Sequence, residues 1–481
     1  MLKLNKKVLV TRVLVLLAIA FLPIGLVYSK ATNLKKSKNV VKTSKKIKYT
    51  ASKRSISENH ANSTGKIKNA NVKKHSKAVV SAATLPTEKS DVSNNEIGAA
   101  NAPSGGGVYI TPKVIRVLID EKNTNKSQTL TIKAKESFVL ESPGGSKVTA
   151  LFNDKNVDVI AKNGKLYLRC SDKKFRHIRY DDLEVYASHG NLELNGKSYQ
   201  GSVNIRIDPL TWNVLIVNRI DLDDYIYSVL KSESVPTWPL EMQKVQAIAS
   251  RSYALHHMKQ VRLKNPRSFY DIRNTRQNQV YDGVHAFKHL RDAVDQTRGV
   301  ILTYKGDIVL AMFDICCGGI IPSKMRKNKK CMPYLRRDKP CNFCKNTAFY
   351  RSQLVYKKEH LLNIAKASPN LKKRFEGFGN KLNDIQITDR DAAGVVQKVR
   401  FAGRKYVNLS GLEVLALFGD KVKSCSFSIK QDGDKLIFAF KGWGHFNGLC
   451  QWGARSLVSQ GWDYRKILSF YYPGTNLSRL K

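Results

Sequence analysis

Glu233 is a candidate acid catalyst in this chain of 481 residues. It lies between two segments with helical spacing and is followed closely by Val235, Pro236 and Trp238. An apolar surrounding disfavours the charged form of a carboxyl group, so its pKa rises and it can act as an acid near neutral pH. The alternative is an ordinary linker glutamate, and spacing alone favours that alternative.

A second segment, residues 441–455, combines glycines with aromatic and polar side chains. Its glycines allow the backbone to approach a ligand closely. Trp443 and Trp452 offer flat apolar faces, while His445 and Gln451 offer hydrogen bonds. This mixture suits a sugar or peptide cleft, in which apolar walls carry a few placed polar groups. The alternative is a tight turn packed under a core aromatic residue.

Of the eight cysteines, five lie between residues 316 and 344, a sixth lies in the segment 441–455, and two look isolated. Four of the six can form a thiolate zinc site: Cys317, Cys331, Cys341 and Cys344. Disulfides are the favoured interpretation in an oxidising exterior, and free buried thiols are a third. The other two of the six are Cys316 and Cys450, and the isolated pair, Cys170 and Cys425, is expected to pack as small apolar residues.

The elements that must position these residues are strands first and helices later. Short β-branched runs between residues 108 and 220 are separated by turn residues, including Asn163-Gly164 and Asn195-Gly196, which are typical of hairpins. Residues 222–232 read as a helix with Asp221 as its N-cap. A second helix starts near Pro239 and keeps its spacing to about residue 256. Strands are expected at 300–302 and 308–312, and a helix at 451–460. The mixture predicts an α+β fold.

The N-terminus predicts export. Lysines in the first seven residues precede an apolar stretch, and residues 13–28 carry no charge. This pattern is typical of a signal peptide, or of an uncleaved membrane anchor with Arg12 near the inner interface. No A-x-A-like cleavage site follows, which favours the anchor. The body is therefore expected on the outer side of the cytoplasmic membrane, or secreted if the signal is removed.

The charge is strongly positive, and its density along the chain is highest before the folded body. The chain holds 83 Lys and Arg against 38 Asp and Glu, and residues 1–105 hold 20 against 4. Residues 31–106, rich in Lys, Ser and Asn, cannot bury enough apolar area to fold and read as a disordered tether. The charge excludes an ordinary acidic cytosolic enzyme and indicates an anionic partner, such as lipid or wall polymer. A nucleic-acid binder explains the charge but leaves the anchor unexplained.

Five segments of the chain form an ordered set of motifs. They are Leu222-Asp-Asp-Tyr225 with Glu233, Pro236 and Trp238-Pro239; Val245-Gln-Ala-Ile-Ala-Ser-Arg251-Ser-Tyr253-Ala; Gln279-Val-Tyr281; Thr297-Arg-Gly299 to Cys317-Gly-Gly319; and Gly442-Trp-Gly-His445 through Gln451 to Tyr471-Tyr-Pro-Gly474. Together they resemble the sporulation stage II protein D and amidase-enhancer family (SpoIID/LytB type) of exported peptidoglycan lytic proteins. They span about residues 115–475, most of the expected folded body.

The resemblance implies a lytic transglycosylase whose essential acid is Glu233. A hydrolase flanks the bond with two carboxyl groups. A lytic transglycosylase uses the C6 hydroxyl of N-acetylmuramic acid as a tethered nucleophile, so one carboxyl suffices and no cofactor is required. Substrate-binding roles are expected for Gln279, Tyr281, Trp443, His445, Gln451 and Arg251. For Arg251 a structural ion pair is the stronger alternative, and Tyr253 is expected in the core.

The chain departs from the family at two places. Some members carry a Cys/His zinc cluster just before the Gln-Val-Tyr segment, but here that stretch is Asp271-Ile-Arg-Asn-Thr-Arg-Gln-Asn278. Arg and Asn do not replace thiolate ligands, so that metal site is not expected. A histidine that commonly precedes the Cys-Gly-Gly element is also replaced, because the sequence there reads Asp314-Ile-Cys-Cys.

The predicted organisation is a signal anchor or signal peptide at 1–30, a linker at 31–106 and a SpoIID-like catalytic domain at 107–481. That domain is β-rich over 107–220 and α+β over 221–481. The leading hypothesis is an enzyme that remodels the cell wall in division or a sporulation-like process, with peptidoglycan glycan strands as substrate and an amidase as a possible partner. The alternative is a binding module that holds glycan or stimulates an amidase without cutting.

Overall fold

The computed structural model describes residues 113–142, 147–151, 154–178 and 181–480. The predicted anchor at 1–30 and linker at 31–106 lie outside the described residues. Within the described ranges, none of the helices combines the length and the apolar composition that crossing a bilayer requires.

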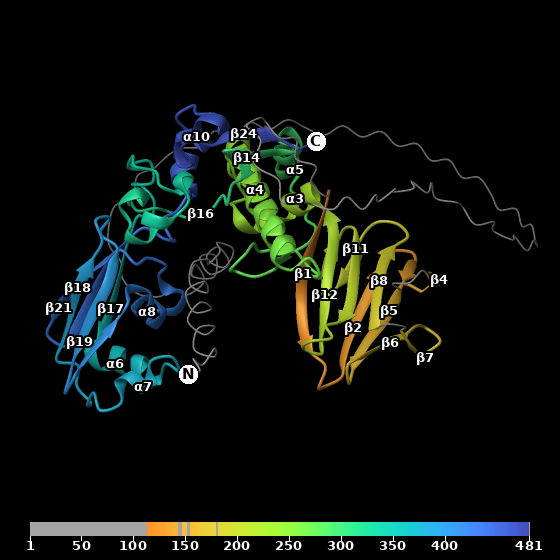
Figure 1. Cartoon of the computed structure of the whole chain (residues 1–481), viewed down its shortest axis with the longest axis horizontal. Coiled ribbons are helices and arrows are strands. Elements are labelled where there is room, and N and C mark those ends of the chain that lie inside the picture. The colour runs from red at the N-terminus through yellow and green to blue at the C-terminus, as the bar shows by residue number, and fades with distance from the viewer. Residues whose placement is uncertain (1–112, 143–146, 152–153, 179–180, 481) are drawn as a thin grey trace, which may run out of the picture. The chain divides into compact units, whose positions relative to one another are not determined.

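The first part of the described chain consists of strands in two antiparallel-rich sheets (Figure 1). Side chains alternate between buried and more exposed along β2 and β6, as expected where one face of a strand packs on a core. One sheet has the strand order β13-β1-β12-β11-β8-β3-β4 and the other β10-β9-β2-β5-β6-β7. The strands are β1 (Val114–Asn123), β2 (Gln128–Ala134), β3 (Phe138–Glu141), β4 (Lys147–Leu151), β5 (Asn156–Lys162), β6 (Lys165–Arg169), β7 (Phe175–His177), β8 (Asp182–Ala187), β9 (Leu192–Leu194), β10 (Lys197–Tyr199), β11 (Ser202–Ile207), β12 (Asn213–Asp221) and β13 (Ile272–Arg273).

Both predicted Asn-Gly hairpins are present. Asn163 and Gly164 have φ values of 50° and 70° and join β5 to β6, which pair antiparallel. Asn195 and Gly196 have φ values of 53° and 72° and join β9 to β10. Two consecutive residues with positive φ match the right-handed twist of the strands they connect, and Asn and Gly adopt that conformation at low cost.

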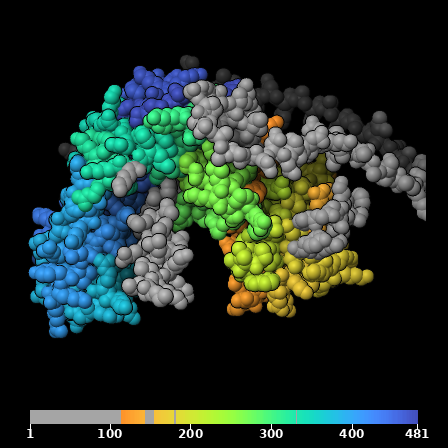
Figure 2. Space-filling view, viewed as in Figure 1, coloured from red at the N-terminus to blue at the C-terminus, as the bar shows by residue number. Residues whose placement is uncertain are grey.

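Three helices follow the strands: α3 (Leu222–Glu233), α4 (Leu240–Lys264) and α5 (Lys288–Gln296). The Asp221 side chain accepts hydrogen bonds from the backbone N–H groups of Asp223 and Asp224, so the predicted N-cap is confirmed. Helix α4 begins after Pro239 as expected, but it runs eight residues past the predicted end near residue 256. Its middle is buried on nearly all sides, and Figure 2 shows green atoms of this region meeting the yellow-green atoms of the strand-rich part.

The strand expected at 308–312 is only partly correct. β14 (Val300–Tyr304) pairs with β15 (Asp307–Ile308) and with β24 (Asn476–Arg479). The Val309 N–H still donates to the Leu302 carbonyl of β14, but the next donor, the Leu310 N–H, binds the hydroxyl of Tyr334 and not a neighbouring strand.

The remaining residues form two further three-stranded sheets with short helices around a core rich in phenylalanine, and a C-terminal group of elements that packs in a separate core with part of α4. One sheet has the order β17-β22-β21 and the other β18-β19-β20, while β16 pairs in parallel with β23. These elements are β16 (Phe313–Asp314), β17 (Arg351–Lys357), α6 (Lys358–Ala367), α7 (Lys372–Phe375), β18 (Asp384–Arg390), β19 (Val396–Ala402), β20 (Tyr406–Leu409), α8 (Gly411–Leu417), β21 (Phe427–Asp432), β22 (Lys435–Lys441), β23 (Leu449–Cys450), α9 (Gln451–Val458) and α10 (Tyr464–Tyr471). The described chain is therefore α+β, as predicted, and α9 agrees with the helix expected at 451–460.

Candidate functional site

Glu233 is the last residue of α3, and its side chain is enclosed: the residue is only 2% exposed. The helix stops here because Ser234 takes an extended conformation, with its N–H still donating to the Leu230 carbonyl. Pro236 follows two residues later and disfavours a helical conformation in the residue before it. Val235 and Trp238 are also buried, so the apolar surrounding predicted for this carboxyl group is present.

Burial raises the pKa of Glu233 to about 7. The loss of water around the charged form is the largest cause, and the nearby negative charge of Asp282 adds to it. One contact acts the other way: the backbone N–H of Val280 donates to Glu233 Oε1 at 2.7 Å and stabilises the carboxylate. A carboxyl group with this pKa holds its proton for a substantial fraction of the time near neutral pH, which is what a general acid requires.

A chain of buried amide side chains connects the site to the C-terminal segment. The Gln451 Nε2 group donates to the Glu233 carbonyl at 2.7 Å and also contacts the side-chain oxygen of Gln246 at 3.1 Å. Gln246 in turn donates to the Ser250 hydroxyl at 3.2 Å. The predicted residue Gln451 therefore lies beside Glu233, but it contacts the main chain and not the carboxyl group.

The Gln-Val-Tyr segment lies against the same helices. Gln279 donates to the Ser250 carbonyl at 3.2 Å and accepts from the Tyr225 hydroxyl at 3.0 Å. The Tyr281 hydroxyl donates to Asn218 Oδ1 at 2.6 Å. Gln279 and Tyr281 are both fully buried, so their contacts are with the protein itself. A glycan-binding role for either residue stays a prediction that their placement does not support.

Arg251 is also fully buried, and it binds other protein groups. Its guanidinium contacts Asp223 Oδ1 at 2.7 Å and donates to the Val300 carbonyl at 3.0 Å. The ion pair joins α4 to the start of α3. This is the structural alternative considered for Arg251, and substrate contact stays a prediction. Tyr253, expected in the core, is 2% exposed.

Trp443 and His445 lie next to the strand pair β16–β23. Trp443 is half-buried and meets Phe349 edge to face, with ring centroids 5.6 Å apart. His445 lies 3.9 Å from the carboxyl group of Asp314. Burial, the largest cause, and the nearby charge of Lys327 together lower the pKa of His445 to about 3, so the imidazole is neutral at physiological pH.

The glycines of residues 441–455 accommodate protein atoms where a ligand was expected. A Cβ added at Gly442 would lie 2.8 Å from the Cys316 carbonyl oxygen, and one at Gly318 would lie 2.4 Å from the Gly442 nitrogen. At Gly444, with φ at +142°, a Cβ would lie 2.3 Å from the Asp314 side chain. The expectation that these glycines admit a ligand is therefore corrected: they allow the Cys-Gly-Gly turn and the Gly-Trp-Gly-His segment to pack against each other.

Aromatic rings connect the loop after Glu233 to the C-terminal segment. The Trp238 and Trp452 rings meet edge to face with centroids 5.2 Å apart, and Phe349 lies between Trp452 and Trp443 at 6.0 Å and 5.6 Å. Trp443 and Trp452 remain half-buried. Together these rings offer the kind of apolar surface on which sugar rings pack.

The cysteines gather differently from the prediction. The sulfur atoms of one group lie within 4.8 Å of one another, and this group contains Cys450 in place of Cys331. Cys331 is half-buried and outside the group, so the predicted set is corrected at that position. We call this group the four-cysteine cluster; it consists of Cys317, Cys341, Cys344 and Cys450.

Sequence reasoning missed the groups nearest to Glu233. The Val280 N–H is a backbone group, so no side-chain pattern identifies it. Gln246 falls on the helical spacing of α4, but a buried glutamine on a helix has no signature of its own. One signal could have indicated Val280: it lies between Gln279 and Tyr281, in a segment that the family resemblance associates with the site.

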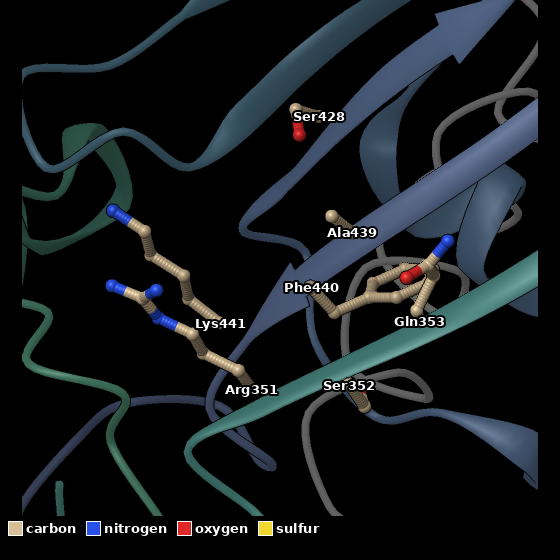
Figure 3. Close-up of a pocket in the computed structure, with 7 residues that line it drawn as sticks. All are labelled: Arg351, Ser352, Gln353, Ser428, Ala439, Phe440 and Lys441. Carbon is tan, nitrogen blue, oxygen red and sulfur yellow. The ribbon is translucent and has the colours of Figure 1, made fainter.

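A shallow hollow of about 540 Å³ lies elsewhere, on the β17–β22–β21 sheet. Figure 3 shows the basic side chains of Arg351 and Lys441, which face each other across β17 and β22, extending in the same direction. None of the residues lining this hollow is among the predicted site residues.

The fold and site define an α+β protein organised around a buried carboxyl group at the end of a helix. Comparison with known proteins shows that residues 212–304 match the family model of the stage II sporulation protein (SpoIID). The matched residues include α3, all of α4, α5 and the Gln-Val-Tyr segment. This match, together with the relatives below, supports the resemblance to the SpoIID family.

Full-length relatives are similar over a larger part of the chain. An uncharacterized protein of Brachyspira hyodysenteriae is 29% identical over 300 residues, which cover 62% of this chain and 77% of that protein. The amidase enhancer of Bacillus subtilis is 26% identical, covering 61% of this chain and 46% of its own length. The stage II sporulation protein D of the same organism is 24% identical, covering 54% and 76%.

Proposed function

We propose that this protein is a peptidoglycan lytic transglycosylase, and that Glu233 is its only acid–base catalyst. The observation that carries the proposal is the burial of the Glu233 carboxyl group at the end of α3, with its pKa raised to about 7. The resemblance to lytic members of the family supplies the substrate, the bond between N-acetylmuramic acid and N-acetylglucosamine.

The proposed reaction needs one carboxyl group. Protonated Glu233 gives its proton to the glycosidic oxygen as the bond to C1 of the muramic acid residue breaks. The C6 hydroxyl of the same sugar then attacks C1, and the Glu233 carboxylate accepts the hydroxyl proton as the 1,6-anhydro ring closes. Because the nucleophile is tethered to the reacting carbon, its effective concentration is high and a second carboxyl group is unnecessary. The Val280 N–H stabilises the carboxylate that forms between the two proton transfers.

A second function is favoured by the enclosure of Glu233. A catalytic acid must touch its substrate, and a residue that is 2% exposed meets a glycan only after the segments around it move. A protein that binds glycan through the half-buried Trp443 and Trp452, and stimulates an amidase, needs no such movement. The name of the B. subtilis relative, amidase enhancer, agrees with this alternative.

The deciding experiment compares Glu233→Gln with the unaltered full-length chain on purified glycan strands, using mass spectrometry to detect 1,6-anhydro products. Glutamine keeps the size of the side chain and an acceptor for the Val280 N–H, but it carries no transferable proton. We expect product formation to fall by a factor of about 100 or more. Glu193→Gln, which alters an exposed ion pair with Lys133, is the matched control and should retain activity. Equal product yields from Glu233→Gln and the unaltered chain would exclude the enzymatic function and leave the binding function.

We further propose that the protein acts outside the cytoplasm, attached by residues 1–30 or released after their removal. The signal-like N-terminus and the basic tether support this location. Membrane fractionation of the full-length protein, with N-terminal sequencing, distinguishes an anchored chain from a processed one. Retention of the whole chain in the cytoplasm would contradict the proposal.

A further inference from the structure

The four-cysteine cluster brings together three separate segments of the chain. One cysteine follows β16, two come from the Cys-x-x-Cys loop at 341–344, and one ends β23. Each of these cysteines is at most 1% exposed. The four-cysteine cluster is not the Cys/His cluster described above for some family members. Its residues all come after the Gln-Val-Tyr segment, and none of them is a histidine.

The sulfur positions match a tetrahedral metal site better than disulfides. Zinc binds thiolates at about 2.3 Å, so two ligands at the tetrahedral angle lie about 3.8 Å apart. The sulfur atoms of Cys317 and Cys344 are 3.8 Å apart, and all four sulfur atoms lie within 4.8 Å of one another. Disulfides would instead draw the sulfur atoms into two pairs about 2 Å apart.

Hydrogen-bond donors surround the sulfur atoms, as they do in many metal–thiolate sites. The backbone N–H of Cys317 donates to the sulfur of Cys450 at 3.3 Å. The Tyr471 hydroxyl lies 3.2 Å from the sulfur of Cys341. Such donors reduce the excess negative charge of bound thiolates and fix their orientation.

Gly453 leaves the space that the cluster occupies. A Cβ at this position would lie 2.7 Å from the Cys341 sulfur and 3.2 Å from the Cys450 sulfur. The guanidinium of buried Arg337 lies 5.6 Å from the centre of the ring of Tyr471, whose hydroxyl contacts the Cys341 sulfur, and brings positive charge near this part of the cluster. Four thiolates and one divalent ion carry a net negative charge, so a neighbouring cation is favourable.

We propose that the four-cysteine cluster binds one structural zinc ion. Four soft thiolate ligands with tetrahedral spacing select zinc over the harder divalent cations. All four ligand positions are filled by protein, so no position is left for water or substrate, as in structural sites. The ion would join the Cys-Gly-Gly turn to the Cys-x-x-Cys loop and to the start of α9. Because Gln451 directly follows one ligand, the ion also fixes the helix that contacts the Glu233 carbonyl.

The test uses the full-length protein purified without chelators or added metal. We expect elemental analysis to find about one zinc per chain. After exchange with Co²⁺, we expect thiolate-to-metal charge-transfer absorption and the visible bands of tetrahedral cobalt. These measurements need no variant. They do not depend on glycan cleavage, so failure of this proposal and failure of the proposed enzymatic function are separate results.

Matched variants test which cysteines bind the ion. Cys341→Ser and Cys450→Ser should each lower the zinc content several-fold, whereas Cys331→Ser and Cys425→Ser should leave it unchanged. Cys331 is the sharper control because it lies close in sequence to the Cys-x-x-Cys loop but outside the cluster. Loss of zinc in Cys331→Ser with retention in Cys450→Ser would overturn the assignment.

Three other outcomes would overturn the proposal itself. The first is two disulfides. Thiol counting and intact-mass measurement on the unfolded chain would then find four fewer thiols without reductant than with reductant. Iron found at equal content in place of zinc would assign the site to another metal. Four free thiols in protein that takes up neither zinc nor cobalt would show that the cluster binds no metal.

Discussion

The side-chain amide of Gln451 donates a hydrogen bond of 2.7 Å to the main-chain carbonyl of Glu233, across 218 residues of sequence. This contact joins the end of α3 to the start of α9, two of the five segments by which the family resemblance was identified. The position of the catalytic candidate is thus determined in part by a side chain from the C-terminal segment. The contact is buried, so its loss has a measurable effect on stability.

Gln451→Ala is expected to destabilise the protein by about 1–3 kcal/mol. The substitution leaves the Glu233 carbonyl and the Gln246 side chain without a buried donor, and an unsatisfied buried polar group costs about that amount. Chemical denaturation measures the change. Gln353→Ala, at an exposed position of β17, is the control and should change stability by no more than about 0.5 kcal/mol. Equal effects from both variants would contradict the contact.

Glu233→Gln is expected to stabilise the protein at alkaline pH. The pKa of Glu233 rises from 4.5 to about 7 on folding, so the folded state binds the proton more tightly than the unfolded state. The stability associated with this carboxyl group is fully present below pH 4.5 and is lost as pH rises towards 7. The total loss is about 3.5 kcal/mol, at about 1.4 kcal/mol for each pKa unit.

Unfolding curves of the variant and the unaltered chain at pH 4 and pH 8 test this expectation. The two proteins should be closest in stability at pH 4, and the variant should gain relative to the unaltered chain by pH 8. A difference in stability that does not change between these two pH values would show that Glu233 is not protonated at neutral pH in the folded protein.

Asp282→Asn is expected to lower the pKa of Glu233. The Asp282 charge raises that pKa, and its carboxyl group is held near by Lys197 at 2.6 Å and Ser232 at 3.1 Å. Removing the charge removes this contribution, so the high-pH limit of the proposed lytic activity should move to lower pH by a fraction of a unit. Carbon-13 titration of labelled glutamate measures the same shift without substrate. Movement of the limit to higher pH would contradict the assignment.

Arg251→Ala is expected to cost about 3–5 kcal/mol of stability, because it leaves Asp223 without its buried partner. The double variant Arg251→Met with Asp223→Leu removes both charges and should recover most of the loss. Thermal or chemical unfolding of the two variants measures the difference. If Arg251→Ala left stability unchanged but weakened glycan binding, the substrate role would be favoured over the structural one.

Local signals in the sequence predicted much of the first half of the described fold. The Asn163-Gly164 and Asn195-Gly196 turns and the Asp221 N-cap act on their immediate neighbours, so the residue types alone identify them. The strand expected at 308–312 failed for the opposite reason. The strand can continue only where a partner strand accepts its hydrogen bonds, and the Leu310 N–H donates instead to the Tyr334 hydroxyl. No local pattern reports such a long-range choice.

The candidate site shows the same division. The chemical type of Glu233 and its apolar neighbours could be predicted from six consecutive positions, residues 233–238. The substitution of Cys450 for Cys331 in the four-cysteine cluster was not, because the parallel pairing of β16 with β23 brings residues 314 and 450 together. The glycines of residues 441–455 were recognised as sites of close approach, but spacing did not reveal that the approaching group is the protein's own backbone.

The distance in sequence between Glu233 and Gln451 has a consequence for biosynthesis. Gln451, whose amide binds the Glu233 carbonyl, is synthesised 218 positions after Glu233. A nascent chain released early carries the carboxyl group without the segment that helps enclose it. The site can therefore be completed only after α9 has been synthesised. Chains that terminate before α9 are expected to lack the enclosed site and to be readily degraded.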